Sequence, residues 1–555
     1  MSDPKNPLII QSDNSILLET ANEKFESARD EISQFAELIK SPEYIHTYRI
    51  NPLSLWNSAS VGYTSEQIID ILNRYSKYEI PSNVLQNIRD NIEKYGKIKL
   101  FKEDDRLILQ STDEYIVTEI THQKTIQPLI DRKIDVLTLY IKPESRGRLK
   151  QALLKLGYPV EDIAGYVDGD SYNIELRDVT LQGESFNFRK YQIDAIHSFH
   201  KDGSNLGGSG VIVLPCGSGK TVIGIGIMEK LKMHTLVLAT NIIAIRQWRD
   251  ELMDKTNLTD EDIGEYSGEK KEIKPITLST YQILTHRKTK ESDFKHFALF
   301  NERNWGLVIY DEVHLLPAPV FRIVADIQSK RRLGLTATLV REDGKEDDVF
   351  SLIGPKKFDI PWKLLEEQGW IATAECIEIR LELPEKLKLK YATAERRDKY
   401  RIASTNPKKI DIIKKVITQH PDDNILIIGQ YLDQLHIISE AFNVPIITGA
   451  TPNKEREKLY GDFKNGKIKM LIVSKVANFA IDLPDANVAI QISGTFGSRQ
   501  EEAQRLGRIL RPKKGENQAH FYSIVTRNTF DQDYASNRQL FLTEQGYKYS
   551  ILSAT

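Results

Sequence analysis

The stretch VIVLPCGSGKTVIGIGIMEKL, residues 211–231, joins an apolar run, a glycine-bearing loop and a helix-length apolar segment. Gly217 and Gly219 let backbone N–H groups turn inward around phosphates, a role in which Pro215, Cys216 and Ser218 complete the loop. Lys220 is then placed to reach β- and γ-phosphates, and Thr221 to ligate Mg²⁺. The stretch therefore predicts a strand, a phosphate-binding loop and a helix.

This loop departs from the usual pattern GxxxxGK[ST], because Leu214 stands at the first glycine position. The alternative is an incidental Gly-Ser-Gly turn. The strand before the loop and the helix after it favour phosphate binding, since that mechanism needs both.

Short β-rich runs alternate with helix-length segments from about residue 184 onward. Ten of these runs fall into two groups of five, namely 211–215, 235–239, 276–280, 307–312 and 333–338, then 425–429, 444–448, 470–474, 488–492 and 521–525. Continuous apolar strands between helices indicate buried parallel sheets. We expect an α/β protein with two doubly wound lobes, at residues 185–355 and 356–555, with the boundary between Ile353 and Trp370.

GLVIYDEVH, residues 306–314, is an apolar strand that ends in two carboxylates. Open parallel sheets bind ligands at this edge of their strands. We expect Asp311 to hold Mg²⁺ and Glu312 to position and deprotonate an attacking water. A lone Asp-Glu pair is more often solvated surface charge, but here it ends its own apolar strand.

Two further segments complete the predicted nucleotide site. Thr336 and Thr338 end another strand, where small hydroxyls could sense the γ-phosphate and, with His314, couple it to the second lobe; the alternative is a plain turn. The segment EEAQRLGRILRPKK, residues 501–514, spaces Arg505, Arg508 and Arg511 along one side of a helix. We expect Arg508 and Arg511 to act as arginine fingers beside Gln504, the alternative being a basic surface helix.

The stretch from Lys386 to Lys409 carries nine basic residues in a chain whose net charge is −2. We expect it to contact nucleic acid, with Tyr391 and Tyr400 stacking on bases or sugars; the alternative is a solvated helix face. The basic residues assigned to this contact are Lys386, Lys388, Lys390, Arg396, Arg397, Lys399 and Arg401.

Residues 1–125 are expected to form an N-terminal accessory domain. Helices from Thr64 and from Pro81, followed by a hairpin across Glu103 to Asp105, suggest a winged-helix-like module for nucleic-acid contact; a protein-docking or packing module is favoured at least as much. Residues 126–184 predict a small α/β module, with strands in VLTLYI (136–141) and YNIEL (172–176) around a helix ending at Gly157.

Bulk properties restrict the class further. With 555 residues, 40% of them hydrophobic and 28% charged, the chain predicts several globular domains. Only two cysteines occur, which indicates neither a disulfide framework nor a zinc site. No apolar run of about 18 residues and no signal peptide is present, so a cytoplasmic protein without membrane contact is expected.

Several motifs, taken together, resemble the XPB family of superfamily 2 DNA repair helicases, in its bacterial form. They are LPCGSGKT (214–221), STYQIL (279–284), YDEVHLLPA (310–318), LGLTATLVREDG (333–344), FSLIGPK (350–356), SKVANFAIDLPDANVAIQIS (474–493), GSRQEEAQRLGRILRPKKG (497–515) and RQLFLTEQGY (538–547). The resemblance is strong from Phe188 to about Tyr549 and extends to residues 45–58 and 74–85.

The resemblance implies two RecA-like lobes and an ATP- and Mg²⁺-dependent 3′–5′ helicase acting on single-stranded or forked DNA, with a repair nuclease or another repair protein as partner. It assigns adenine reading to Gln192 beside Arg189, and nucleotide contact to Asp482. The triplet Arg341, Glu342 and Asp343 matches an element associated with duplex opening. The basic stretch at about 384–409 matches a thumb-like insertion, and residues 131–178 match a module proposed to sense damage.

The sequence departs from this family's pattern at two points. Ala480 stands where related motors often carry glycine, and the chain lacks the long carboxy-terminal extension of eukaryotic members. The same motifs also suit a duplex translocase that remodels bound proteins without separating strands. An ATP-gated binding scaffold and a motor that acts on RNA stay open as well.

Overall fold

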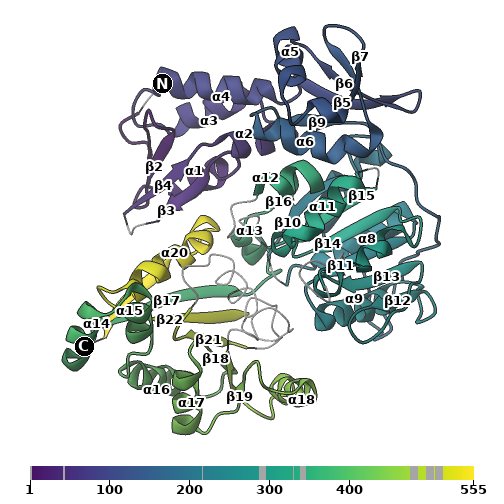
Figure 1. Ribbon diagram of the computed structural model, residues 1–555. Coiled ribbons are helices and arrows are strands. Elements are labelled where there is room, and N and C mark those ends of the chain that lie inside the picture. The colour runs from purple at the N-terminus through teal and green to yellow at the C-terminus, as the bar shows by residue number, and fades with distance from the viewer. Residues whose placement is uncertain are drawn as a thin grey trace. The chain divides into compact units, whose positions relative to one another are not determined.

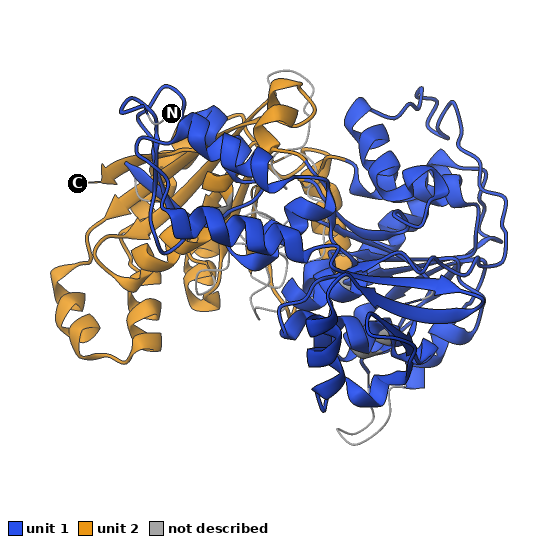
Figure 2. Cartoon of the chain, turned by 90° about the horizontal axis from the view of Figure 1, so that it is seen from above, with its two compact units in different colours: residues 1–37, 44–214, 219–359 blue, residues 38–43, 215–218, 360–555 orange. Residues whose placement is uncertain are grey.

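The computed structural model describes residues 3–41, 44–215, 217–286, 295–328, 330–337, 346–474, 486–494, 506 and 517–554. The chain divides into two compact units (Figure 2). Unit 1 comprises residues 1–37, 44–214 and 219–359, and unit 2 comprises residues 38–43, 215–218 and 360–555. The last segment of unit 1 ends at Asp359, and the last segment of unit 2 begins at Ile360.

Unit 1 contains a seven-stranded parallel sheet of order β12-β13-β11-β14-β15-β10-β16, coloured teal to green in Figure 1. Its strands are β10 (Ser209–Val213), β11 (Thr235–Ala239), β12 (Ile263–Tyr266), β13 (Ile276–Thr280), β14 (Leu307–Asp311), β15 (Arg331–Thr336) and β16 (Lys356–Asp359). Five of them are the predicted apolar runs, and β12 and β16 add the edges. The order makes β14, β15 and β10 neighbours, so their carboxyl ends meet at one edge.

Helices cover both faces of this sheet, as expected for a doubly wound lobe. They are α7 (Lys190–His200), α8 (Lys220–Leu231), α9 (Ile242–Lys255), α10 (Tyr281–Leu284), η4 (Lys295–Asn301), η5 (Val313–Leu315), α11 (Ala318–Asp326), α12 (Glu346–Asp348) and η6 (Val349–Ile353). One core cluster joins Val211, Val213 and Tyr310 to η5, α11 and η6. Leu335 of β15 instead lies near Gly224 of α8. Because successive side chains of a strand point to opposite faces, α8 covers the other face of the sheet.

Unit 2 contains a second seven-stranded parallel sheet, of order β19-β20-β18-β21-β22-β17-β23. Its strands are β17 (Thr373–Leu381), β18 (Ile425–Gly429), β19 (Ile446–Ile447), β20 (Met470–Ser474), β21 (Val488–Gln491), β22 (Gln518–Thr526) and β23 (Tyr549–Ala554). The described helices are α13 (Trp362–Glu367), α14 (Glu385–Thr393), α15 (Arg396–Ser404), α16 (Lys409–Gln419), α17 (Leu432–Phe442), α18 (Asn453–Lys464) and α20 (Phe530–Glu544).

The second sheet is also covered on both faces. Ile377 and Ile379 of β17 share a core cluster with Ile413 of α16. Glu378, between them in sequence, points to the other face, where its Oε2 accepts a hydrogen bond of 2.7 Å from Gln539 of α20. Two doubly wound parallel-sheet lobes are therefore present, as the sequence predicts.

The front part of unit 1 holds further small elements, shown in purple to blue in Figure 1. They are β1 (Leu8–Ile10), β2 (Ser15–Glu19), α1 (Phe25–Ile32), β4 (Ile45–Arg49), α2 (Pro52–Ser60), α3 (Ser65–Tyr75), α4 (Ser82–Lys94), β5 (Ile98–Glu103), β6 (Arg106–Ser111), α5 (Glu114–His122), η1 (Gln127–Leu129), β7 (Ile130–Lys133), β8 (Thr138–Ile141), η2 (Pro143–Ser145), α6 (Arg146–Lys155) and β9 (Val160–Asp162). A further strand, β3 (Glu37–Lys40), falls mostly in the residues assigned to unit 2. The helix predicted from Thr64 is α3, which a capping box of Thr64 and Gln67 starts.

Two features differ from the sequence expectation. The hairpin β5–β6 joins the five-stranded sheet β7-β8-β6-β5-β9, so this sheet crosses the boundary expected at residue 125. The expected return strand at residues 172–176 is wrong. That segment runs along the parallel-sheet lobe, with single bridges from Ser171 to Met233 and from Leu176 to Thr256, and β9 takes the place in the small sheet.

Among the described residues, no helix combines the length and the apolar character needed to cross a bilayer.

Candidate nucleotide site

The phosphate-binding loop lies between β10 and α8. Gly217 and Gly219 both have the left-handed φ values of 81° and 85° that favour glycine. Lys220 and Thr221 follow as the first two residues of the 12-residue helix α8, so the N-terminus of this helix and the positive end of its dipole face the loop. Ser218 Oγ donates to the carbonyl of Pro215 at 2.7 Å and shapes the loop from within.

Gln192 of α7 lies directly against this loop. A Cβ atom on Gly219 would come within 2.7 Å of the Gln192 Nε2 atom, and the left-handed backbone of Gly219 also favours glycine. The Gln192 side-chain oxygen accepts a hydrogen bond of 2.9 Å from the backbone N–H of Arg189, and the Arg189 guanidinium donates to the Tyr191 hydroxyl at 3.2 Å. The residues predicted to read the base therefore lie beside those predicted to hold the phosphates.

Two glycines in α8 set the neighbouring helices close to it. A Cβ atom at Gly224 would approach Trp248 Cη2 of α9 to 2.5 Å, and one at Gly226 would approach Ile196 of α7 to 2.4 Å. These close contacts carry the indole of Trp248 and the helix of Gln192 toward the phosphate loop. Glycine inside a helix is less favourable than alanine, and the close packing of α7 and α9 against α8 offsets this loss.

Asp311 ends β14 and is held by three contacts. Its Oδ2 accepts a hydrogen bond of 2.9 Å from Trp248 Nε1, its Oδ1 accepts one of 3.0 Å from the N–H of Glu312, and its carbonyl accepts one of 2.9 Å from the Tyr281 hydroxyl. Burial raises the pKa of Asp311 to about 6, and the neighbouring Glu312 carboxylate adds to the rise, while Trp248 and Lys220 oppose it. Such a carboxylate gains from a cation.

Glu312 faces Lys220 across the loop. Its Oε1 atom lies 3.8 Å from the Lys220 amine, and its Oε2 atom lies 3.4 Å from His314 Nδ1. The backbone of Glu312 has a φ of 48°, in the left-handed region that costs energy for residues other than glycine and recurs at functional sites. The strained turn directs the second carboxylate toward the amine rather than along the strand.

The groups of this site fit a nucleoside triphosphate with Mg²⁺. Two glycines with left-handed backbone and a helix N-terminus form a loop suited to phosphates. The Lys220 amine lies beside this loop, 3.3 Å from the carbonyl of Leu214. Glu312 Oε2 is buried and accepts no hydrogen bond from any described residue. A carboxylate with spare acceptor capacity beside a lysine suits an attacking water, and oxygen ligands from Thr221 and Asp311 suit Mg²⁺.

His314 and Thr336 connect the carboxylate strand to its neighbour. His314 Nδ1 lies 2.7 Å from Thr336 Oγ1, and both side chains are buried. The carbonyl of Thr336 accepts a hydrogen bond of 2.9 Å from the N–H of Leu214, at the start of the phosphate loop. Two of the three predicted coupling residues thus form one chain from Glu312 to the loop.

Several predicted site residues lie outside the described part of the chain. They are Cys216, Thr338, Arg341, Glu342, Asp343, Asp482, Gln504, Arg508 and Arg511. Conversely, the sequence pattern predicted no role for Trp248 or Tyr281, which position Asp311. The sequence signal that could have indicated Trp248 is a tryptophan among the charged residues of the segment 246–255.

The basic stretch forms two short helices, α14 and α15. Six of the seven predicted nucleic-acid contacts are exposed, and Lys399 is half-buried. The stacking role expected for Tyr400 is wrong: its side chain is fully buried, donates to the carbonyl of Gly494 and packs edge-on against Tyr534 at 4.8 Å. The Tyr391 hydroxyl accepts a hydrogen bond of 2.9 Å from the N–H of Phe530.

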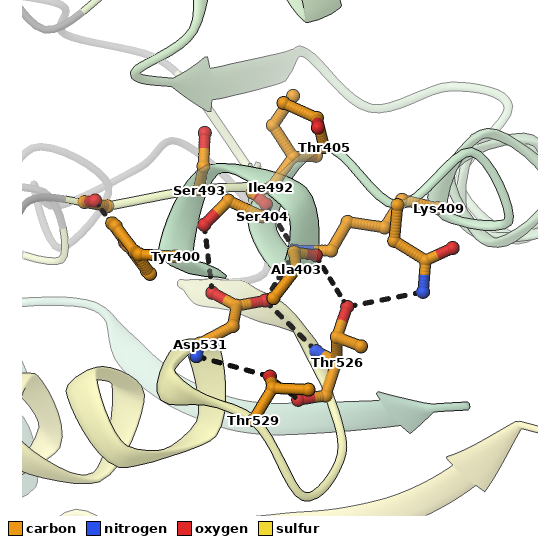
Figure 3. A network of polar contacts seen from close by, with 12 residues as sticks. Tyr400, Ala403, Ser404, Thr405, Lys409, Ile492, Ser493, Thr526, Thr529 and Asp531 are labelled. Atoms are coloured by element: carbon orange, nitrogen blue, oxygen red, sulfur yellow. Dashed lines mark hydrogen bonds and ion pairs between the residues drawn. The ribbon is translucent and has the colours of Figure 1, made fainter. Parts of the chain in front are cut away.

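Lys409 is also not part of the basic surface. Its amine is buried, donates to the carbonyl of Ile492 at 2.6 Å and pairs with Asp531 Oδ2 at 2.8 Å (Figure 3). The same carboxylate oxygen accepts from the N–H of Thr526 at 3.0 Å. This network fixes the end of α15 and the start of α16 to the carboxyl ends of β21 and β22.

A parallel sheet whose adjacent strands end in a phosphate loop, a carboxylate pair and a buried hydroxyl defines a P-loop nucleoside triphosphatase. A second doubly wound lobe follows it in the same chain, as in helicase motors. Sequence comparison narrows the class: the chain belongs to the XPB family of helicases. It is 53% identical to the DNA 3′-5′ helicase XPB of Mycobacterium tuberculosis, over 99% of this chain and 98% of that protein.

Further relatives agree with this family. The chain is 50% identical to the DNA 3′-5′ helicase XPB of Kineococcus radiotolerans, over 99% of this chain and 96% of that protein. It is 31% identical to the general transcription and DNA repair factor IIH helicase/translocase subunit XPB/SSL2 of Saccharomyces cerevisiae, over 98% and 72% of the two chains. Family profiles match the ERCC3/RAD25/XPB C-terminal helicase at 365–555, a helicase conserved C-terminal domain at 8–135 and the type III restriction enzyme res subunit at 185–341.

Proposed function

We propose that this protein is an ATP-driven 3′–5′ DNA helicase acting in DNA repair. The observation that carries the proposal is the juxtaposition of Lys220 and Glu312, 3.8 Å apart, at the sheet edge where the phosphate loop ends. Family membership supplies the polarity and the polymer, because full-length relatives are named DNA 3′-5′ helicases.

The proposed chemistry rests on the described half-site. Lys220 and the loop N–H groups bind the β- and γ-phosphates, and Gln192 with Arg189 holds the base. Thr221 and Asp311 would hold Mg²⁺, which when bound would neutralise charge on the transferred phosphoryl group. Glu312 orients a water and accepts its proton. His314 and Thr336 report the state of this carboxylate to the phosphate loop.

The remaining roles rest on the sequence pattern and on the resemblance to the family. Arg508, Arg511 and Gln504 supply transition-state charge stabilisation, with Asp482 contacting the nucleotide and Thr338 taking part in coupling. Arg341, Glu342 and Asp343 act on the duplex. A repair nuclease or another repair protein is the expected partner, and the cytoplasm the expected compartment.

The DNA contact is assigned to the exposed face of α14 and α15. Their six exposed cations can neutralise backbone phosphates without reading sequence. The buried Lys409–Asp531 pair gives these helices a fixed base on the second sheet. A fixed base allows movement of that lobe to be passed to DNA as displacement along the strand.

The test is ATP turnover with single-stranded DNA, duplex DNA and RNA, followed by unwinding of 3′- and 5′-tailed duplexes. We expect DNA-stimulated turnover and unwinding of the 3′-tailed duplex. Glu312→Gln should lose about 10²–10⁴-fold in turnover while still binding nucleotide, and Lys220→Ala should lose both. Glu261→Gln, an exposed loop carboxylate, is the control. Equal stimulation by all three polymers would exclude the DNA assignment, and translocation without strand release would favour the duplex translocase.

A further inference from the structure

A pocket of about 290 Å³ lies in unit 1, away from the phosphate loop. We call it the junction pocket, because its walls come from three parts of the unit: the end of α2 and of α4, the α6–β9 module, and the β10–β16 edge of the parallel sheet. Its lining includes Val61, Lys150, Leu154, Lys201, Leu206 and Lys357. Its volume is at the lower end of the range for small-molecule sites.

The walls are held in place by direct contacts between these parts. Trp56 of α2, Leu154 of α6 and Phe350 of η6 form one buried apolar cluster. Asn57 of α2 accepts a hydrogen bond of 3.0 Å from the N–H of Lys356, and Gln151 of α6 donates to Asp348 at 2.7 Å. The junction pocket is therefore a built feature of the fold.

The charge around the junction pocket is unbalanced. Its two carboxylates are already neutralised: Asp162 by Arg146 at 2.8 Å and Lys150 at 2.7 Å, and Glu161 by Lys99 at 3.5 Å. Lys201 and Lys357 form no ion pair with any described residue, so the lining holds three lysines against two carboxylates, and Arg146 and Lys99 from outside the lining also pair with those carboxylates. Lys201 is exposed and Lys357 is partly buried, and a partly buried charge without an ion pair favours a bound anion.

Lys357 is the cation that the fold positions most tightly. A Cβ atom on Gly210 would come within 2.4 Å of Lys357 Cγ, so the glycine leaves room for its stem. The amine donates to the carbonyl of Leu206 at 3.1 Å. Burial lowers the pKa of Lys357 to about 8, and the nearby Lys201 contributes to the fall, while Glu161 opposes it. An amine with this environment gains from a bound anion.

Apolar side chains stand beside these cations. Val61 is 47% exposed and Leu206 is 55% exposed, so both offer uncovered apolar surface to an occupant of the pocket. Leu154 and Phe350 add apolar lining further inside. An inorganic anion would leave this surface in water, whereas an anion with an organic body would cover it.

We propose that the junction pocket binds a small organic phosphate, with the phosphate on Lys150, Lys201 and Lys357 and the organic part against Val61, Leu154 and Leu206. Such a ligand would tie the three parts of unit 1 together. Binding to the folded state alone stabilises that state, so occupancy would raise the thermal midpoint of the unit.

The test is calorimetric titration of the full chain with phenyl phosphate, in a buffer without phosphate. We expect a Kd of about 1 mM or tighter, weaker binding of inorganic phosphate, and no binding of phenol. Lys357→Met should weaken binding about tenfold or more, and so should Lys201→Met at an exposed position that tolerates change. Lys356→Met, the adjacent cation that pairs with Asp359, is the matched control and should bind as the parent does.

Three results would overturn the assignment. One is equal binding by the parent, Lys357→Met and Lys201→Met proteins. Another is loss of binding in Lys220→Ala, because the phosphate loop would then be the site. The third is displacement of phenyl phosphate by a single-stranded DNA oligomer in a manner that needs Lys357, which would assign the cations to a DNA phosphate.

Discussion

The amine of Lys409 lies 2.8 Å from the Asp531 carboxylate, and neither side chain is more than 1% exposed. These residues are 122 positions apart in the chain. Their pairing joins the first turn of α16 to the first turn of α20, immediately behind the basic helices. It is an ion pair in the protein interior, where losing one partner leaves the other charge buried and uncompensated.

We therefore expect Lys409→Met to destabilise unit 2 by about 3–5 kcal/mol. Burial lowers the pKa of the Lys409 amine while Asp531 opposes the fall, so the pair holds the charge in place. Hydrogen exchange across α15 and α16, together with denaturant unfolding, measures the effect. The control Lys408→Met changes an exposed neighbour and should stay within about 0.5 kcal/mol. Equal effects of the two variants would contradict a stabilising role for the pair.

Lys409 also shows where sequence reasoning ends. A run of nine cations predicts a basic surface, and six of the seven assigned contacts are indeed exposed. Burial of Lys409 and Tyr400 depends on Asp531 and Gly494, which lie far along the chain. Local pattern carries no information on such partners.

The sheets were easier to predict than their edges. All ten apolar runs contain strands. Nine of these strands lie inside the sheets, where parallel strands are buried on both faces, whereas β19 is an edge strand. Edge strands such as KKFD at β16 lack that signature and were not predicted. At the nucleotide site, the order of the motifs predicts the phosphate loop and the carboxylates. The contact of Trp248 with Asp311 was not predicted, because the two residues are 63 positions apart and only the fold brings them together.

The hydrogen bond from Trp248 to Asp311 gives a second prediction. Trp248→Phe keeps an aromatic ring against Gly224 but removes the indole N–H, so the orientation of the Asp311 carboxylate is lost. Groups that orient a metal ligand are worth about 10–100-fold in metal affinity or activity. We expect the Mg²⁺ concentration for half-maximal ATP turnover to rise by that factor.

Trp305→Phe is the matched control for this change. Trp305 is equally buried in the same lobe, but its indole donates at 2.9 Å to the carbonyl of Leu299 rather than to the site. Its variant should lose stability and keep its Mg²⁺ dependence. If both variants shifted the Mg²⁺ dependence alike, general loosening of the lobe would be the cause.

Lys357 should make the free energy of unfolding depend on pH in the alkaline range. Its pKa in the folded protein is about 8, below the ordinary value of 10.5, because burial disfavours the charged amine. Between these values the unfolded chain binds more protons, so the free energy of unfolding should rise with pH, by up to about 1.4 kcal/mol per unit. Below pH 8 both states are protonated and the penalty is fully present.

Denaturant unfolding between pH 7 and pH 10.5, without phosphate, measures this contribution as the difference between the parent and Lys357→Met. The variant should lack the rise that the parent shows, and Lys356→Met should retain it. A parallel pH dependence in the parent and in Lys357→Met would show that this amine titrates near its ordinary pKa.

The exposed face of α14 and α15 leads to the last prediction, which concerns salt. Lys390 and Arg397 are exposed cations on the two helices. If each neutralises one DNA phosphate, each alanine variant should weaken binding on all sequences alike and reduce the slope of log affinity against log salt by about 1. Fluorescence anisotropy with a tailed duplex at several salt concentrations measures the slope. The control Lys415→Ala removes an exposed cation from α16 and should leave the slope unchanged. An equal decrease of the slope in all three variants would show that net charge, rather than contact by α14 and α15, determines DNA binding.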